Sequence, residues 1–227
     1  QDMIREKYEA VWKQIAERFA KYDEHLIFES MNEESDGTYD GDPNKEYYAN
    51  LNQYNQIFVD TVRGTGEKNT HRWLLVPGWN TNIEYTIGDY GFEMPTDEKC
   101  SAGESRMMVS VHYYDPWDYC GIEDLKTILW GEYGDNLIEV NGFPKMNKAK
   151  WGDESYLDDL FSRMQEKFVK NDIPVIIGEY GCIDKSSAYA DFAGQIQGNR
   201  AYWDGYVAGK AASMGMIPVY WDNGFNG

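Results

Sequence analysis

Strand-like and helix-like segments alternate along this chain, and this order restricts its possible folds more than any other feature. Five apolar runs, rich in β-branched and aromatic residues, have the length and composition of buried strands. They lie within residues 26–29, 72–80, 107–117, 173–181 and 216–224. The alternation predicts a parallel sheet, and right-handed crossovers allow either a doubly wound sheet or a (β/α) barrel.

The helix-like segments are recognised by apolar stripes and by capping residues. Apolar residues recur at the helical period within 4–19, and again within 203–214. Asn44 is expected to cap a further helix. Ser155, followed three positions later by Asp158, is expected to open another as a capping box.

Each of the five apolar runs is followed by polar or aromatic residues that could take part in chemistry. No GxGxxG motif or P-loop follows any of the runs, which argues against a nucleotide-binding doubly wound sheet. In a barrel the carboxyl ends of the strands meet at one mouth, where active-site residues collect. We therefore expect a barrel. The residues at these ends are Asn32 and Glu33, Trp79 and Asn80, His112 and Tyr114, Glu179, and Trp221 with Asp222.

The charge and the aromatic content narrow the class of ligand. The 227 residues include 21 basic and 39 acidic side chains, a net charge of −18, so nucleic acid or an anionic membrane would be repelled. A neutral sugar meets no such barrier. Eighteen Tyr, eight Trp and nine Phe exceed what the core of one such domain requires, and flat aromatic faces stack on sugar rings.

The spacing of the cysteines and the length of the apolar runs argue against a zinc site and against a membrane-spanning segment. Cys100, Cys120 and Cys182 show no CxxC spacing, which argues against a zinc site. Cys120 and Cys182 both follow strands, so a disulfide between them and free thiols are both open. The sequence has no run of 18 apolar residues and no segment typical of a signal peptide.

Glu33 and Glu179 form the strongest candidate constellation. Either one alone could be a solvated strand end. Two carboxylates at the same mouth of a barrel are the groups that acetal hydrolysis needs, one to donate a proton and one to attack or to activate water. Asn32, directly before Glu33, could bind a hydroxyl next to the reacting carbon.

These motifs resemble those of glycoside hydrolase family 5, in the clan of retaining (β/α)8-barrel glycosidases. The run "FESMNEE" resembles the fourth-strand "NEP" signature, although Glu34 replaces the usual proline. The runs "VHYYDPW", "IIGEYG" and "VYWDNG" resemble the sixth-, seventh- and eighth-strand motifs. The forms "HYYDPWDYCG" and "VYWDNG" are most like those of the subfamily 4 endoglucanases and xyloglucanases.

The resemblance implies a role for each matching residue. Glu33 would be the acid/base, Glu179 the nucleophile, and Asn32 the ligand of the 2-hydroxyl group. His112 and Tyr114 would shape the site around Glu179. Further substrate-binding candidates are Trp221 as the platform under the reacting sugar, and Trp79, Asn80 and Trp117 beside it. The segment 120–152 is longer than an ordinary loop and is expected to wall the cleft.

The implied protein is a retaining endo-β-1,4-glucanase that acts on cellulose-like, mixed-linkage or xyloglucan polysaccharides without metal or organic cofactor. A β-mannanase or xylanase on the same barrel, or a non-catalytic sugar-binding protein, are the alternatives. The resemblance also implies an extracellular location.

The five runs resemble the fourth to eighth strands of the family's barrel. We therefore expect one domain over residues 1–227 that is an incomplete (β/α)8 TIM barrel, without the first three strands and the last helix. Such an arc exposes two apolar edges. The chain is expected to be part of a larger enzyme or to pair with a complementing polypeptide.

Overall fold

The computed structural model describes residues 2–37, 41–222 and 224. The chain divides into two compact units, and each is described by itself. The first unit comprises Gln1–Val111 and Asp172–Val175, and the second comprises His112–Asn171 and Ile176–Gly227. The single-domain organisation expected from the sequence stays a prediction.

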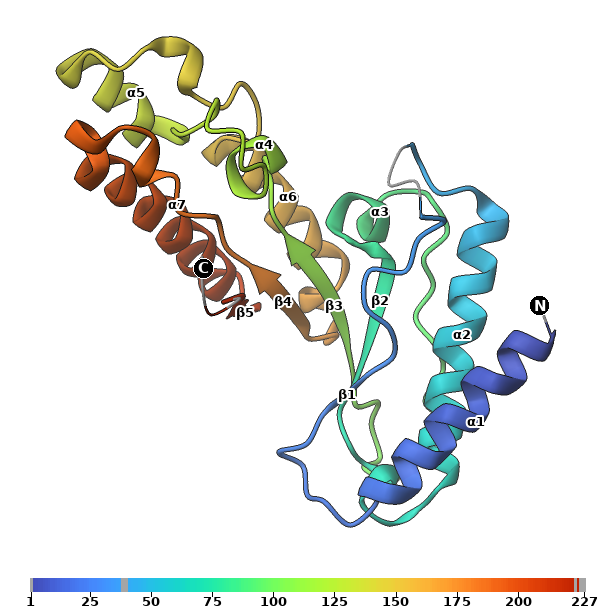
Figure 1. Ribbon diagram of the computed structural model, residues 1–227. Coiled ribbons are helices and arrows are strands. Elements are labelled where there is room, and N and C mark those ends of the chain that lie inside the picture. Colours follow the sequence, from blue (N-terminus) through green and yellow to red (C-terminus); the bar gives the residue numbers. More distant parts are fainter. Residues whose placement is uncertain (1, 38–40, 223, 225–227) are drawn as a thin grey trace. The chain divides into compact units, whose positions relative to one another are not determined.

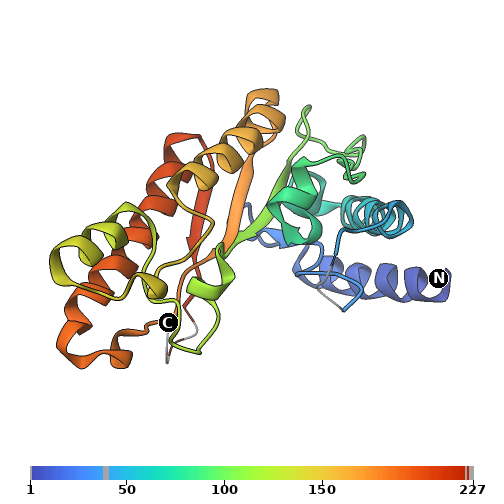
Figure 2. The same cartoon turned by 90° about the horizontal axis from the view of Figure 1, so that it is seen from above.

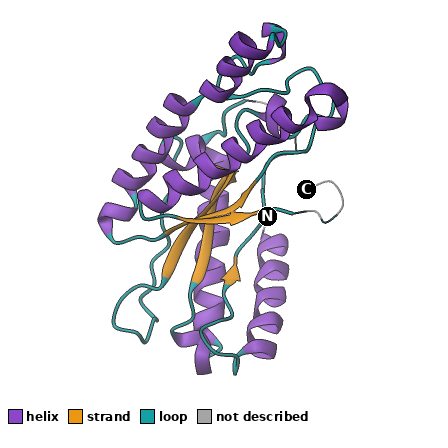
Figure 3. Cartoon of the chain, turned by 90° about the vertical axis from the view of Figure 1, so that its left-hand side faces the viewer, coloured by secondary structure: helices purple, strands orange, loops and turns teal. Residues whose placement is uncertain are grey.

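Strands alternate with helices along the chain, as predicted, and Figure 3 distinguishes them by colour. The strands follow one another in sheet order β1-β2-β3-β4-β5. β1 pairs with β2 and β4 pairs with β5, both in the parallel sense. Their bounds are β1 Phe28–Glu29, β2 Leu74–Asn82, β3 Met107–Tyr113, β4 Val175–Tyr180 and β5 Ile217–Tyr220.

In the first unit, α1 (Asp2–Phe19) and α2 (Lys45–Gly64) lie side by side (Figure 1). As predicted, Asn44 caps α2, and its side chain accepts a hydrogen bond from the Tyr47 N–H at 2.9 Å. The apolar faces of both helices pack on β1 and β2, and Trp12 contacts the rings of Phe28 and Phe58. Burial of each such large side chain contributes about 1.5–3 kcal/mol.

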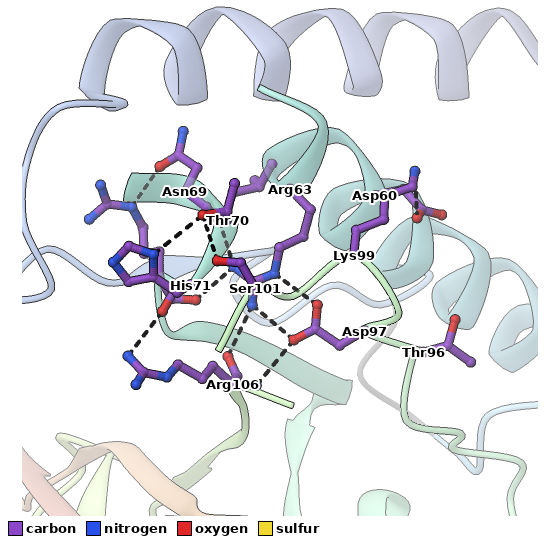
Figure 4. A network of polar contacts seen from close by, with 12 residues as sticks. Asp60, Arg63, Asn69, Thr70, His71, Thr96, Asp97, Lys99, Ser101 and Arg106 are labelled. Carbon is purple, nitrogen blue, oxygen red and sulfur yellow. Dashed lines mark hydrogen bonds and ion pairs between the residues drawn. The ribbon is translucent and has the colours of Figure 1, made fainter. Parts of the chain in front are cut away.

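A polar network that contains the buried side chains of Arg63 and Asp97 lies beside the residues just before β2 (Figure 4). The Arg63 guanidinium on α2 donates to both carboxylate oxygens of Asp97, at 2.8 and 2.9 Å. Both side chains are essentially fully buried. The Arg106 N–H also donates to Asp97, at 3.1 Å, so the residues just before β3 are joined to α2.

Arg72, directly before β2, hydrogen-bonds to the turn between α1 and β1. Its side chain is buried, and its guanidinium donates to four backbone carbonyls. These are the carbonyls of Phe19, Tyr22, Asp23 and Leu26, at distances from 2.5 to 3.2 Å. The sequence predicted a strand from Leu26, but its carbonyl is bound by Arg72, and only Phe28 and Glu29 pair with β2.

In the second unit, α7 (Ala193–Ser213) packs against α5 (Gly131–Asn141) and α6 (Glu154–Lys167), as seen in Figure 2. The segment 120–152, expected as a wall, contains α5 and buries Leu129 and Phe143 in a core with Ile196 of α7. The predicted capping role of Ser155 is wrong, because Asp153 caps α6 and accepts from the Tyr156 N–H.

Shorter elements complete the described residues. The α-helices α3 and α4 comprise Ile83–Ile87 and Trp117–Cys120. The 3-10 helices are Glu67–Thr70, Lys145–Asn147, Val169–Asn171, Ser186–Ala188 and Ala190–Phe192. Cys100, Cys120 and Cys182 are free thiols. Within the described residues, none of the helices combines the length and apolar character needed to span a bilayer.

Candidate active site

Glu179, near the end of β4, is held by two residues from the end of β3. The Tyr114 hydroxyl donates to Glu179 Oε2 at 2.9 Å, and His112 Nδ1 lies 3.4 Å from the same oxygen. The His112 side chain is buried and Glu179 keeps 18% of its side-chain surface exposed. The structure therefore brings together three of the predicted residues and gives Glu179 a fixed orientation with access to solvent.

The alternation of side chains along β3 explains this arrangement. His112 and Tyr114 are two positions apart and point to the same side of the strand, whereas Tyr113 points to the other side. Tyr113 is buried there, and its ring stacks on Trp203 of α7 at 5.9 Å. The same strand thus anchors the helix layer on one side and orients Glu179 on the other.

Two exposed tryptophans of the second unit lie near this group. Trp117 is 54% exposed, and its ring meets the Tyr114 ring edge-on at 6.1 Å. Trp221 is 52% exposed, and its backbone N–H donates to the backbone carbonyl of Tyr180, the neighbour of Glu179, at 2.8 Å. Exposed indole rings beside a solvent-accessible carboxylate are suited to contact a sugar.

Glu33 and Asn32 lie in the first unit, in the segment after β1. Glu33 is half-buried and Asn32 is exposed. The backbone of Glu33 is left-handed, with φ 50°, a conformation that costs roughly 1 kcal/mol or more for a residue other than glycine. The Asn80 N–H donates to the Glu34 carbonyl at 2.9 Å, which fixes this segment to β2.

Glu29, in β1, has a different environment. Its carboxylate accepts a hydrogen bond from the Ser110 hydroxyl of β3 at 2.5 Å. The bond reaches across the intervening strand β2. This contact holds the Glu29 side chain against the strands of the first unit.

Trp79 and Asn80, also in the first unit, line a small pocket. The Trp79 ring stacks on Tyr47 with centroids 5.3 Å apart and an interplanar angle of 10°. Asn80 and the buried Thr81 both have left-handed backbone, with φ 52° and 47°, where the chain turns toward α3. The pocket is lined by Ser35, Asp36, Gly41, Asp42, Pro43, Tyr47, Trp79, Asn80 and Tyr85.

Tyr47 and Tyr48 were not predicted as site residues. The Tyr48 hydroxyl accepts from the Trp79 N–H at 3.1 Å and donates to the Tyr85 carbonyl at 2.5 Å. A sequence signal existed, because both tyrosines lie in the first turn after the Asn44 cap. In a βα unit that turn lies near the carboxyl end of the preceding strand.

Comparison with known proteins shows to which family the chain belongs. The family model described as "Cellulase (glycosyl hydrolase family 5)" matches residues 1–227. Endoglucanase A of Paenibacillus barcinonensis is 50% identical over 231 residues, which cover 100% of this chain and 54% of that protein. A xyloglucan-specific endo-β-1,4-glucanase of Bacteroides ovatus is 32% identical and is covered over 42% of its length. The chain thus spans about half the length of these curated relatives.

Solved structures agree with this result. A family 5 xyloglucanase from Paenibacillus pabuli superposes with a TM-score of 0.90 at 50% identity, covering 100% of this chain and 61% of that one. A GH5-4 broad-specificity endoglucanase from Bacteroides salanitronis gives a TM-score of 0.84 at 38% identity, covering 98% and 54%. The likeness confirms the predicted fold class, an incomplete (β/α)8 barrel, and the predicted nearness to subfamily 4.

Proposed function

Because this chain belongs to the cellulases of glycosyl hydrolase family 5, we propose that it carries the catalytic residues of an endo-acting β-1,4-glucanase. The substrates would be cellulose-like, mixed-linkage or xyloglucan chains, cleaved with retention of anomeric configuration. The observation that carries the proposal is the Glu179 carboxylate, oriented by Tyr114 at 2.9 Å and by His112 at 3.4 Å.

Glu179 is the nucleophile in this proposal. It attacks the anomeric carbon and forms a glycosyl-enzyme intermediate, which water then hydrolyses. The Tyr114 hydroxyl holds one carboxylate oxygen, so the attacking group is oriented before the substrate arrives. In the first unit, Glu33 protonates the departing oxygen and then deprotonates the attacking water, and Asn32 binds the neighbouring hydroxyl.

The aromatic residues supply the binding surface. Trp221 forms the platform for the reacting sugar, and Trp117 extends the aromatic surface beside Tyr114. Trp79 and Asn80 contact a further sugar of the chain, since the Trp79 ring is backed by Tyr47 and the pocket beside it contains amide and hydroxyl groups. Flat rings stack on sugar faces, and the amide, hydroxyl and carboxylate groups of the pocket, the last from Asp36 and Asp42, can bond to sugar hydroxyls.

The first experiment combines a substrate panel with carboxamide variants. The protein, with the rest of its barrel present, is assayed on β-glucan, xyloglucan, mannan and xylan, with product anomers read by NMR. We expect β-anomeric products from the glucans and a loss of roughly 10³-fold or more in kcat for Glu179→Gln. Turnover by Glu179→Gln equal to the wild type would refute the nucleophile assignment. Preferential cleavage of mannan or xylan would refute the glucanase assignment.

We also propose that a further part of the barrel completes this one, in the same or a complementing polypeptide. In β5, Ile217 is 47% exposed and Val219 is 41% exposed, so an apolar strand is left uncovered. Light scattering that shows the isolated chain as a folded monomer, without any binding partner, would contradict this.

We propose, finally, that the protein acts outside the cell, since its polymeric substrates are too large to enter. Fractionation of the producing cells, with activity measured in medium and lysate, tests the location. Activity confined to the lysate would exclude it.

A further inference from the structure

We propose that Arg200 of α7 is a positioning residue that holds the Trp221 platform beside the strand end that carries Glu179. The inference rests on the proposed function, because the position of Trp221 matters to activity only if a sugar stacks on it. All the contacts involved lie within the second unit.

Arg200 joins the ends of two neighbouring strands. Its Nε donates to the carbonyl of Cys182 at 2.7 Å, three residues after Glu179. Its Nη2 donates to the Tyr220 hydroxyl, also at 2.7 Å, directly before Trp221. The planar guanidinium presents these donors in a fixed fork, so one side chain sets the separation of both strand ends from α7.

The pairing of β4 and β5 is irregular where this bridge is made. Ile177 pairs with Pro218 and Tyr180 with Tyr220, so three steps on β4 correspond to two on β5. Pro218 has no N–H to donate to the ladder. The bulge disrupts the ladder locally and leaves fewer backbone hydrogen bonds between the two strand ends, and the side-chain bridge from Arg200 supplies an additional constraint there.

Little else in the described residues constrains Trp221. Its N–H donates to the Tyr180 carbonyl at 2.8 Å, and the Tyr180 and Tyr220 rings meet edge-on at 5.6 Å. Tyr220 is 40% exposed and Trp221 is 52% exposed, so neither is locked by packing on all sides. Asp204, one turn after Arg200 on α7, has its carboxylate 4.0 Å from Arg200 Nε and helps to orient the guanidinium.

A double-mutant cycle tests the coupling between Arg200 and Trp221. The four proteins are the wild type, Arg200→Met, Trp221→Ala and the double variant, each assayed for kcat/KM on soluble β-glucan. We expect Arg200→Met to lower kcat/KM about tenfold or more in the wild-type background, because a displaced platform misaligns the reacting sugar. In the Trp221→Ala background the same change should cost less than about threefold.

Two hydroxyl deletions make the test independent of a large change in stability. Tyr220→Phe removes only the acceptor of the Arg200 bond and should lower kcat/KM in the same direction, again with a smaller effect when Trp221 is Ala. Tyr206→Phe is the matched control, since it removes a 3.0 Å bond from α7 to Asp158 that touches neither strand end. Tyr206→Phe should leave kcat/KM unchanged.

The outcomes separate the two proposals. If Arg200→Met and Tyr220→Phe keep full activity, or cost the same with and without Trp221, the positioning role is overturned while the glucanase assignment stands. If the wild type and Tyr206→Phe, each assayed with the rest of the barrel present, do not cleave any β-glucan, the proposed function itself fails. If Arg200→Met does not fold, the cycle of Tyr220→Phe with Trp221→Ala decides.

Discussion

Substitution of Asp97 by Asn should destabilise the first unit by about 3 kcal/mol, at the lower end of the range for breaking a buried ion pair. The carboxylate receives two hydrogen bonds from Arg63, at 2.8 and 2.9 Å, and both side chains are buried. An asparagine can keep one of these bonds, but its NH₂ group faces a guanidinium N–H, and the Arg63 charge loses its counter-ion. Arg63 still donates to the carbonyls of Asn69 and Arg72, which limits the loss.

The assay is thermal unfolding followed by circular dichroism. For a chain of 150–250 residues, 1 kcal/mol shifts Tm by roughly 2–4 °C, so Asp97→Asn should lower Tm by about 6–12 °C. Asp60→Asn is the matched control, because Asp60 pairs with Lys99 at 3.2 Å where both side chains are about half exposed. Such an exposed pair contributes about 0–1 kcal/mol. Equal shifts for Asp97→Asn and Asp60→Asn would refute the reasoning.

The same ion pair predicts a pH dependence. Burial alone would raise the pKa of Asp97, but the hydrogen bonds from Arg63 and from the Arg106 N–H, with the Arg63 charge, lower it below 3.8. The folded-state pKa is thus below the unfolded value, so this stabilisation is present above pH 4 and is lost as the pH falls through the folded pKa. The Tm difference between wild type and Asp97→Asn should be constant from pH 5 to 8 and shrink below pH 4. A difference that narrows between pH 8 and 5 would contradict this.

Three further predictions concern the second unit and the acid/base residue. Tyr114→Phe should lower kcat roughly tenfold, since a hydrogen bond to a charged group is worth about 1.5–3 kcal/mol; an unchanged kcat would show that Tyr114 does not orient Glu179. Glu33→Gln should lose activity on polymers yet still release an aryl leaving group that needs no protonation, as a burst in stopped-flow absorbance; equal loss on both substrates would exclude the acid role. Burial raises the pKa of Asp204 to about 6, against the opposing charge of Arg200. The folded form therefore binds an extra proton between about pH 4 and 6, and stability is lost as the pH rises through that window. Asp204→Asn should raise stability at pH 7.5 by about 1–2 kcal/mol, discounted for partial exposure, and much less at pH 4, as measured by urea unfolding. A gain of equal size at both pH values would contradict it.

Helices and their caps could be predicted because short-range sequence patterns specify them. The helix α1 and the Asn44 cap of α2 depend on residues a few positions apart, and both are confirmed. The apolar stripe of α1 is confirmed only in part, because Ile4 and Val11 are exposed while the rest of the stripe packs on the core. Helix α5 was not predicted. It begins at Gly131, and the preceding residue, Trp130, makes no side-chain capping bond, so the sequence carries no capping signal at its start. The order of strands and helices specified the fold class, but it did not specify where each strand begins.

Among the candidate site residues, those at strand ends could be found from sequence, because strand ends in a parallel sheet converge whatever the loops do. His112, Tyr114 and Glu179 are found together for this reason. Tyr48 and Arg200 lie on helices, and their partners are 31 and 20 positions away along the chain. Helical periodicity gives no indication of a bond to a particular distant carbonyl or hydroxyl, so such residues appear only once the chain is folded.

The position of Arg72 in the chain has a consequence for biosynthesis. The four carbonyls that it binds belong to residues made 46 to 53 positions earlier. As the polypeptide leaves the ribosome from its N-terminus, the bend after α1 stays without its main hydrogen-bond donor until the start of β2 has emerged. The first unit therefore cannot complete the corner between α1 and β1 before residue 72 has emerged, and nascent chains that end before residue 72 should be sensitive to protease between residues 19 and 26.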